Sequence, residues 1–192
     1  MRNSILTTIF VLICSVAFAS PAVLYGSNNQ EKAIASNPLT IGGSTGIISV
    51  DPTIYAGAYT TGMDIGGKIT IANAVTSTGG TGIINSIVLT DKAKQNLPVD
   101  VVFFSSDPSS TTITDDFTLT VADADLVNII GSIPVSSLDY INFADNSVAT
   151  VKNQGLSFSS TTTTIYAAVV ARGSATYAST SDLRLKVKIY KD

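Results

Sequence analysis

A strict alternation of apolar and charged residues near the end of the chain limits its fold more than any other feature. The apolar members are Leu183, Leu185, Val187 and Ile189, and they alternate with Asp182, Arg184, Lys186 and Lys188. A period of two places the apolar side chains on one face of a β-strand and the charges on the other. A strand of this kind has one wet face, which is typical of antiparallel sheets.

Short β-type runs separated by turn residues fill the chain from residue 53 onward. Val, Ile, Tyr, Phe and Thr are abundant in these runs, as strands prefer. We expect strands over 53–60, 68–75, 83–90, 99–105, 117–121, 131–136, 140–151, 156–159, 164–172 and 182–190. The predicted fold class is all-β: an antiparallel two-sheet sandwich, jelly-roll-like, because short strands at regular spacing are typical of these folds.

Two of the runs are apolar on both faces, and one short segment has helical spacing. The runs are 99–104 and 166–170, which we interpret as central strands or as strands covered by a second layer or a partner subunit. The helical segment extends from Asp123 to Ile130. It begins with acidic residues, which suit a helix N-terminus, and it ends before Gly131.

The N-terminus has the three-part pattern of a secretory signal. Arg2 precedes an apolar run from Ile5 to Phe18, and small residues surround Ala19. This pattern predicts cleavage near Ala19, although a buried N-terminal element is the alternative. Cleavage there would remove Cys14 and leave a mature chain without cysteine. We therefore divide the chain into a signal-peptide-like segment (1–19), a Gly/Ser-rich arm or first strand (20–52) and a β-sandwich domain (53–192).

The composition argues against most kinds of chemistry. The 192 residues include no His, no Trp and one Cys, which excludes His-based triads, His-ligated zinc and thiolate metal clusters. Lys and Arg number 11 against 14 Asp and Glu, a balance that disfavours nucleic-acid binding. We expect no enzymatic activity, no cofactor, no small-molecule substrate and no nucleic-acid partner.

Pairs of aspartates are the only candidates for a metal or catalytic site. Oxygen ligands from turns can bind Ca²⁺, but the chain has no twelve-residue ligand loop, and Glu31 is its only glutamate. Two carboxylates can also serve a glycosidase, although such clefts usually carry Trp. We expect ordinary turn and helix-cap roles and no metal site at Asp91, Asp107, Asp115, Asp116, Asp123 and Asp125.

Three further motifs have ordinary structural interpretations. The glycine-rich stretch 79–82 is followed by a strand and by no Lys-Ser or Lys-Thr, so it predicts a turn and no phosphate loop. Arg184, Lys186 and Lys188 form a basic stripe that could meet an acidic partner. We favour a solvated face that also discourages edge-to-edge pairing. The tyrosines within strands are predicted to lie in the core or in an interface.

The stretch from about Asp64 to Asp192 resembles a group of structural proteins of tailed bacteriophages and prophages. The resemblance covers roughly two-thirds of the chain and rests on the order and spacing of segments 83–92, 100–104, 107–108, 119–126, 130–131, 143–146, 166–173, 176–177 and 181–183, and on Asp192. None of these is a catalytic motif. The resemblance implies a virion location, a capsid-associated decoration or head-fibre role, a β-sandwich fold, and capsid or other virion proteins as partners.

Two functional hypotheses follow. The first is a phage virion component that forms a homo-oligomer, in which residues 1–19 would act as an assembly arm. The second is an exported bacterial surface, matrix or filament subunit, secreted after cleavage near Ala19, which could polymerise by strand addition from its arm. A secreted enzyme or carbohydrate-binding module is a weaker third hypothesis, because the sequence shows no nucleophile–base pair and no aromatic platform.

Overall fold

The computed structural model describes residues 24–25, 31–33 and 44–192, in two compact units divided after Ile41. In the first unit, β1 (Leu24–Tyr25) and β2 (Glu31–Ala33) form an antiparallel pair. The predicted signal segment 1–19, with Cys14 and the cleavage position at Ala19, lies outside the described residues. Within the described part of the chain, no helix is long and apolar enough to cross a membrane.

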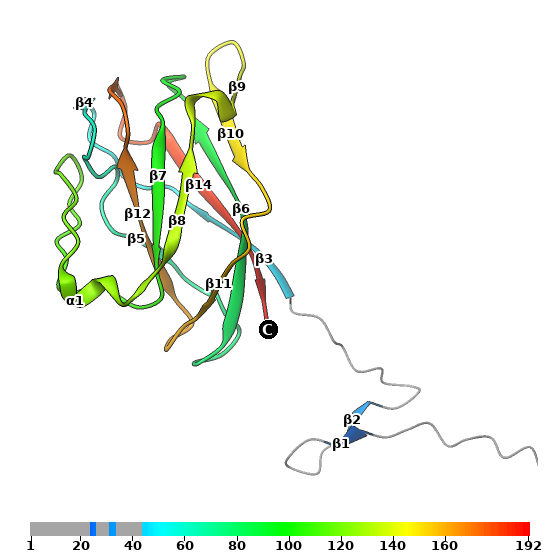
Figure 1. Ribbon diagram of the computed structural model, residues 1–192. Coiled ribbons are helices and arrows are strands. Elements are labelled where there is room, and N and C mark those ends of the chain that lie inside the picture. The colour runs from blue at the N-terminus through cyan, green and yellow to red at the C-terminus, as the bar shows by residue number, and fades with distance from the viewer. Residues whose placement is uncertain (1–23, 26–30, 34–43) are drawn as a thin grey trace, which may run out of the picture. The chain divides into compact units, whose positions relative to one another are not determined.

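The second unit contains two antiparallel sheets, shown in Figure 1. Six strands form the first sheet: β3 (Ser44–Val50), β14 (Leu183–Lys191), β6 (Thr81–Asp91), β10 (Ser147–Val151), β9 (Tyr140–Asn142) and β11 (Leu156–Ser159), the last of which also pairs with β6. Four strands form the second sheet, in the order β5 (Ile69–Ile71), β12 (Ile165–Ala171), β7 (Val99–Phe104) and β8 (Ile129–Val135). The smaller elements are β4 (Ala58–Tyr59), β13 (Ala175–Thr176), α1 (Asp123–Leu126) and the 3-10 turn η1 (Ser137–Asp139).

The strand pairing is that of a jelly roll. In chain order the first principal strand pairs with the last (β3 with β14), and the second with the second-last (β5 with β12). Further inward, β6 pairs with both β10 and β11, and β7 pairs with β8. The chain is thus a long antiparallel hairpin rolled into two sheets, a known eight-stranded all-β solution. The predicted fold class is confirmed.

The main core lies between the two sheets. In β14 the four alternating apolar side chains predicted to point inward are all buried, at 2% exposure or less. They pack with residues such as Ile87 of β6 and Phe103 of β7 in a single cluster. The one-face burial of β14 confirms the alternation derived from its sequence.

The strands that are apolar on both faces are covered by their own chain. Phe104, Ala168 and Val170 lie outside the inter-sheet core, yet each is at most 4% exposed in the isolated chain. Residues Leu119 and Val121, from the connection between β7 and β8, face Val170 across a groove of about 390 Å³. β7 and β12 are the two central strands of the four-stranded sheet, as predicted, and a layer of the same chain covers their outer face without a partner subunit.

Several predicted elements are shorter than expected or absent. The predicted strand 53–60 is reduced to the two residues of β4, because most of this segment is a loop. The predicted strand 117–121 is wrong: only Thr118 forms a bridge, to Met63. The predicted helix from Asp123 to Ile130 stops at Leu126, since Ile129 and Ile130 belong to β8 and pair with β7. The predicted strand 140–151 is a hairpin of β9 and β10.

We expect Phe103→Ala to lower the free energy of unfolding by ~3–5 kcal/mol, because it empties a fully buried position between the sheets. Urea unfolding of the full chain measures the change. Phe117→Ala is the matched control, since the Phe117 side chain is mostly exposed and its loss should cost less than about 0.5 kcal/mol. Equal losses in the two variants would contradict the placement of the core.

Candidate functional site

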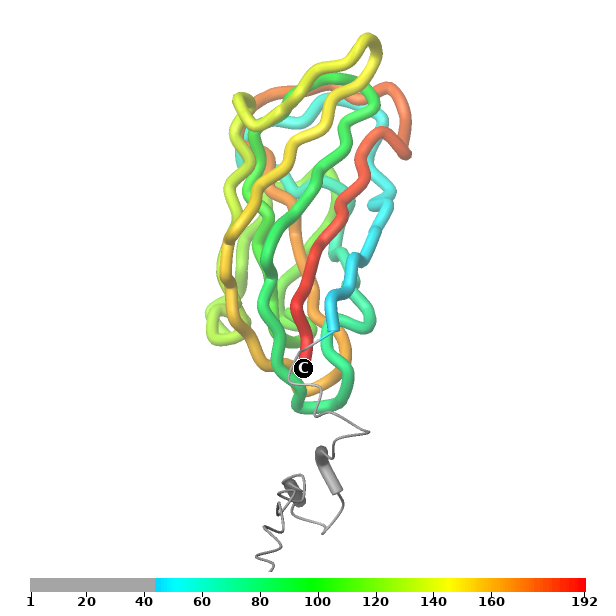
Figure 2. Tube along the Cα trace, turned by 90° about the vertical axis from the view of Figure 1, so that its right-hand side faces the viewer, coloured from blue at the N-terminus to red at the C-terminus, as the bar shows by residue number. Residues whose placement is uncertain are grey.

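The outer face of the six-stranded sheet exposes apolar side chains from three neighbouring strands. In Figure 2 the strands β10, β6, β14 and β3 lie side by side across this face. Tyr190 of β14 lies directly opposite Ile83 of β6, and Ile47 of β3 lies opposite Lys188 of β14. Ile47 is 68% exposed, Ile83 41% and Tyr190 40%. We call these three residues the outer apolar group.

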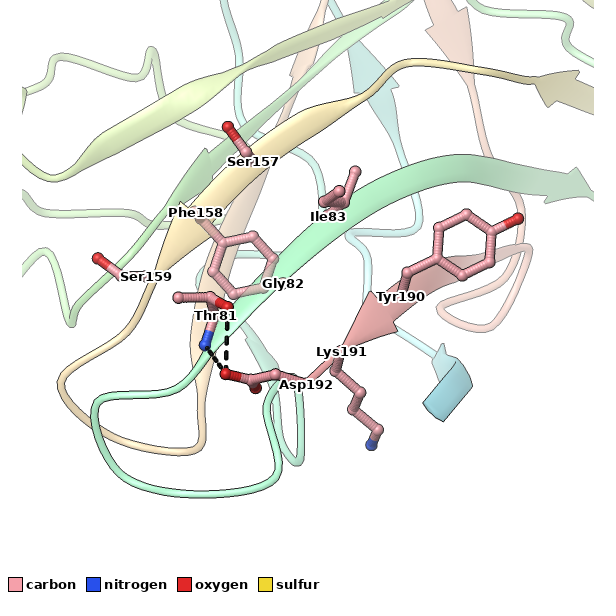
Figure 3. Close-up of a pocket in the computed structure, with 9 residues that line it drawn as sticks. All are labelled: Thr81, Gly82, Ile83, Ser157, Phe158, Ser159, Tyr190, Lys191 and Asp192. Carbon is pink, nitrogen blue, oxygen red and sulfur yellow. Dashed lines mark hydrogen bonds between the residues drawn. The ribbon is translucent and has the colours of Figure 1, made fainter. Parts of the chain in front are cut away.

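Two members of the outer apolar group border a hollow of about 690 Å³ at one end of the sheet. Figure 3 shows Ile83 and Tyr190 on one side of this hollow, with the ring of Phe158 next to Gly82. A Cβ at Gly82 would come within 2.7 Å of that ring, so the glycine permits Phe158 to close the core at this end. Ser157 and Ser159 of β11 complete the rim together with Asp192.

The C-terminal residue fastens this end of the sheet. The Asp192 carboxylate accepts hydrogen bonds from the Thr81 backbone amide at 2.8 Å and from the Thr81 hydroxyl at 3.1 Å (Figure 3). Thr76 donates its hydroxyl proton to the backbone carbonyl of Asp192. Lys191 donates to the carbonyl of Asn73 at 2.8 Å. The polar groups of Thr81, Lys191 and Asp192 therefore hold the chain itself, and Ile83 and Tyr190 are the exposed apolar side chains at the hollow.

The predicted basic stripe lies on the same outer face. Arg184, Lys186 and Lys188 are half-buried on the side of β14 opposite to the core. Arg184 forms a bidentate pair with Asp51, and its hydrogen bond holds the pKa of the Asp51 carboxyl below its ordinary value. The prediction of a solvated face is consistent with this placement. The suggested role in blocking edge pairing is wrong, because β14 lies between β3 and β6.

A second apolar group lies at the opposite edge of the same sheet. Leu138, Ile141 and Phe143, in or beside η1 and β9, are each more than half exposed. Ile141 faces outward, opposite Val148 of β10. Exposed apolar side chains concentrated in this way are typical of surfaces that bind other proteins. This group was not predicted from the sequence, because the expected single strand 140–151 gave no edge at which to place it.

Most aspartates singled out in the sequence stabilise turns. Asp91 accepts from the backbone amides of Ala93 and Asn96, and burial raises the pKa of its carboxyl. The buried Asp125 accepts from the amide of Ser110 and the hydroxyl of Thr111, at 3.0 and 2.7 Å. These contacts are the turn and cap roles expected of such residues.

The remaining aspartates also have structural places. Asp107 pairs with Lys68 at 2.7 Å, and Asp115 accepts from the Tyr59 hydroxyl and the Gly66 amide, both at 2.6 Å. Asp116 occupies a turn and Asp123 the first turn of α1. Among residues 44–192, no three carboxylates or thiols come together in a way that could hold a metal ion.

The glycine-rich stretch 79–82 forms the predicted turn, and three tyrosines lie in the core, whereas Tyr55 and Tyr190 of predicted strands are exposed. Gly79 has a φ of +77° in the turn that precedes β6, and Gly80 donates its amide proton to the carbonyl of Ser77. Tyr59 and Tyr177 are buried and stack edge to face, with ring centroids 5.9 Å apart. The hydroxyl of buried Tyr140 donates to the carbonyl of Leu97. The turn and the core placement of these three tyrosines are confirmed.

Asp64 is the one carboxylate that the sequence analysis missed. Its side chain is fully buried, and neither of its oxygens has a hydrogen-bond partner of normal geometry. Burial raises the pKa of Asp64 to about 7, and the nearby Asp115 carboxylate adds to this rise, while the Gly67 and Val169 amides partly oppose it. Its backbone joins the 116–119 segment, donating to the Phe117 carbonyl and accepting from the Asp116 amide.

Comparisons with known proteins give no family assignment for this chain. Neither a protein-family model nor a curated protein sequence matches this chain. One similar solved structure is a chain of the full particle of Israeli acute paralysis virus heated to 63 degrees. The similarity spans 100% of this chain and 84% of that chain, with 10% sequence identity and a TM-score of 0.28. A similarity this low carries no argument about the function of the protein.

We expect Asp64→Asn to remove a pH dependence of stability. The folded-state pKa of about 7 lies above the ordinary value of 3.8, so the wild-type group favours folding below pH 4 and this contribution is lost as the pH rises through 7. The variant should therefore gain ~4 kcal/mol relative to wild type between pH 4 and pH 8. Urea unfolding of both proteins at pH 4, 6 and 8 measures the difference. Because Asp91 is unchanged, the difference between the curves isolates Asp64, and parallel curves would contradict this assignment.

Proposed function

We propose that this protein is a non-enzymatic structural component of a tailed-phage particle, of the capsid-associated decoration or head-fibre type. It binds capsid or other virion proteins through the outer face of its six-stranded sheet and assembles as a homo-oligomer. The observation that carries the proposal is the outer apolar group, Ile47, Ile83 and Tyr190, which is exposed on one sheet face and of which Ile83 and Tyr190 border the hollow. Apolar surface rimmed by polar residues is typical of protein-binding sites.

Two further observations support this proposal. The chain forms a jelly roll, a fold that capsid proteins use, although lectins and cupins use it too, so that the fold alone does not select a function. The 192-residue sequence has no His and no Trp, which removes imidazole metal centres and tryptophan sugar platforms. The resemblance of residues 64–192 to phage structural proteins then favours a virion role among the functions that this fold serves.

The alternative proposal is an exported bacterial surface, matrix or filament subunit with the same sandwich. The signal-like pattern of residues 1–19 favours it, since a protein assembled in the cytoplasm needs no export signal. After cleavage near Ala19 the mature chain would contain no cysteine. Its stability outside the cell would then depend on the inter-sheet core and on no disulfide.

We expect mass spectrometry of the natural source to find the protein in purified phage-like particles, with its N-terminus at Met1 or Arg2. A virion protein keeps its N-terminal segment because it is assembled where it is made. The same measurement is made on the cell-free secreted fraction as the control. A chain that begins near Ser20 and occurs only in the secreted fraction would contradict the virion role and favour the exported alternative.

We also expect the double variant Ile83→Asp, Tyr190→Asp to lose at least about tenfold in affinity for particles that lack the protein. Two carboxylates on this face would have to be desolvated on binding, which costs more than ~1.4 kcal/mol, the equivalent of a factor of ten. Co-sedimentation of the full chain with such particles measures the affinity. Val127→Asp is the control, because Val127 is 85% exposed and follows α1, outside the six-stranded sheet. Equal binding by the double variant and wild type would place the attachment surface elsewhere.

A further inference from the structure

The strand β3 is a long sheet edge without the features that usually protect edges. Among the described residues it pairs only with β14, and it forms one border of the sheet face in Figure 2. On an edge strand, alternate residues turn their backbone N–H and C=O groups away from the sheet. Proteins usually protect such edges with charged residues, proline or a bulge. The seven residues of β3, Ser-Thr-Gly-Ile-Ile-Ser-Val, contain no charge and no proline, and their pairing with β14 is regular.

The side chains of β3 divide cleanly between its two faces. Thr45, Ile47 and Ser49 are exposed, whereas Ile48 and Val50 are half-buried and pack against the inter-sheet core. Ile47 is the middle residue of the strand, and it exposes 68% of its surface although it is large and apolar. A large apolar side chain at the centre of an edge strand adds little to the stability of the fold while it stays exposed to water.

We propose that β3 of one copy pairs antiparallel with β3 of a second copy, in a twofold interface centred on Ile47. A twofold axis requires each strand to meet the same strand in reverse, so that the middle residue faces its own equivalent. Ile47 then lies opposite Ile47 of the second copy, and Thr45 lies opposite Ser49 on either side. On the inner face, Ile48 lies opposite Gly46 of the second copy. The two six-stranded sheets become one continuous sheet.

The charges of the molecule permit this pairing. Like charges directly opposite each other destabilise a pair of strands, but β3 brings no charge to the interface. The nearest cations on this face belong to β14, where Lys188 lies opposite Ile47. In the dimer Lys188 is separated from its equivalent by three strand spacings, roughly 14 Å. That distance exceeds the Debye length of about 8 Å at physiological ionic strength, so the repulsion is screened.

The other edges of the two sheets are less suited to self-pairing. β9 and β11, the other edge strands of the same sheet, have three and four residues against the seven of β3 and can form fewer backbone hydrogen bonds. β8 contains Pro134, which has no N–H to donate, and a register shift near Gly131. β5 has three residues, and the segment around Asp64, which bridges Val170 further along β12, is already hydrogen-bonded to residues 116–119. The interface rests on the homo-oligomer part of the proposed function and names the surface that forms it.

Site-specific disulfides in the full chain test the register. Cys14→Ser removes the native thiol, and Ile47→Cys then introduces a single cysteine at the predicted twofold axis. Directly opposite residues in antiparallel strands have Cα atoms about 4.5–5.5 Å apart, which suits a disulfide. Mild oxidation should convert this variant into a covalent dimer. The double variant Thr45→Cys, Ser49→Cys should also cross-link between copies. Ile141→Cys is the matched control, since Ile141 is 67% exposed and is the middle residue of β9.

A charge introduced at the centre of the interface provides a second test. Ile47→Lys places two cations opposite each other and should raise the dimer dissociation constant by about tenfold or more, measured by analytical ultracentrifugation. Ser49→Lys should weaken the dimer in the same direction, and Ile141→Lys should leave it unchanged. Circular dichroism and thermal unfolding of each variant separate loss of the dimer from loss of the fold.

The outcomes distinguish this interface from the function on which it rests. Cross-linking at residue 47 together with a weakened dimer in Ile47→Lys supports the proposal. A dimer that survives Ile47→Lys, or that cross-links through residue 141, overturns the β3 interface and leaves self-assembly through another surface. A wild-type chain that stays monomeric at its highest soluble concentration, with no cross-link at residue 47, overturns both the interface and the homo-oligomer. The particle location is measured separately.

Discussion

The placement of the last strand between the first and the third is the constraint on which the rest of the structure depends. β14 pairs with β3 on one side and with β6 on the other, so the six-stranded sheet cannot close before the end of the chain is in place. Each of these pairings joins residues far apart in sequence, which makes folding slow and cooperative. The apolar face of β14 then completes the core, and Asp192 fastens Thr81 at the end of the roll. Loss of β14 would therefore remove the sheet as well as one strand.

The insertion of β14 between β3 and β6 also creates the candidate binding surface. Ile47, Ile83 and Tyr190 come from β3, β6 and β14, which become neighbours only in the finished roll. A partner that recognises this surface consequently binds only the folded chain. This property suits a component that is added to an assembly after folding, because unfolded or half-folded copies present no complete surface. The surface combines these exposed apolar side chains with the basic stripe of β14 on the same face.

Sequence reasoning succeeded where local pattern and tertiary pairing agree. β14 was predictable because its alternation matches its burial residue by residue, and β6, β7 and β12 were predictable because their β-branched and aromatic runs lie between turn signals. The prediction failed where tertiary context decides. Residues 117–121 have a strand-like composition, yet they lie in a connection that bridges only Met63 through Thr118. Residues 127–130 have helical spacing, yet β7 draws Ile129 and Ile130 into a strand.

For the candidate site, too, prediction from the sequence failed where tertiary context decides. The sequence identified the basic residues of β14 and placed them on a wet face, but it could not place β3 beside them, because strand order is a long-range property. Asp64 was missed because a polar residue between Met63 and Ile65 is expected to face water, whereas here the chain folds over that face as well. The exposed apolar residues were also not identified from the sequence. Ile83 and Tyr190 belong to predicted strands, and Ile47 belongs to the predicted arm or first strand. Only the direction in which each side chain points shows that they face outward.

The distribution of polar groups explains why the proposed binding surfaces are edges and faces of the sheets and not cavities. Carboxylates in loops are the usual starting point for catalysis or metal binding, but here Asp91, Asp115 and Asp125 each hold backbone amides or hydroxyls of the chain. A group engaged in this way stabilises the fold and has little capacity left for a ligand. The unsatisfied hydrogen-bonding capacity of the sheets lies instead along their edges. Of these edges, β3 combines the length of seven residues with the absence of charge and proline, and natural proteins seldom leave such an edge without a partner.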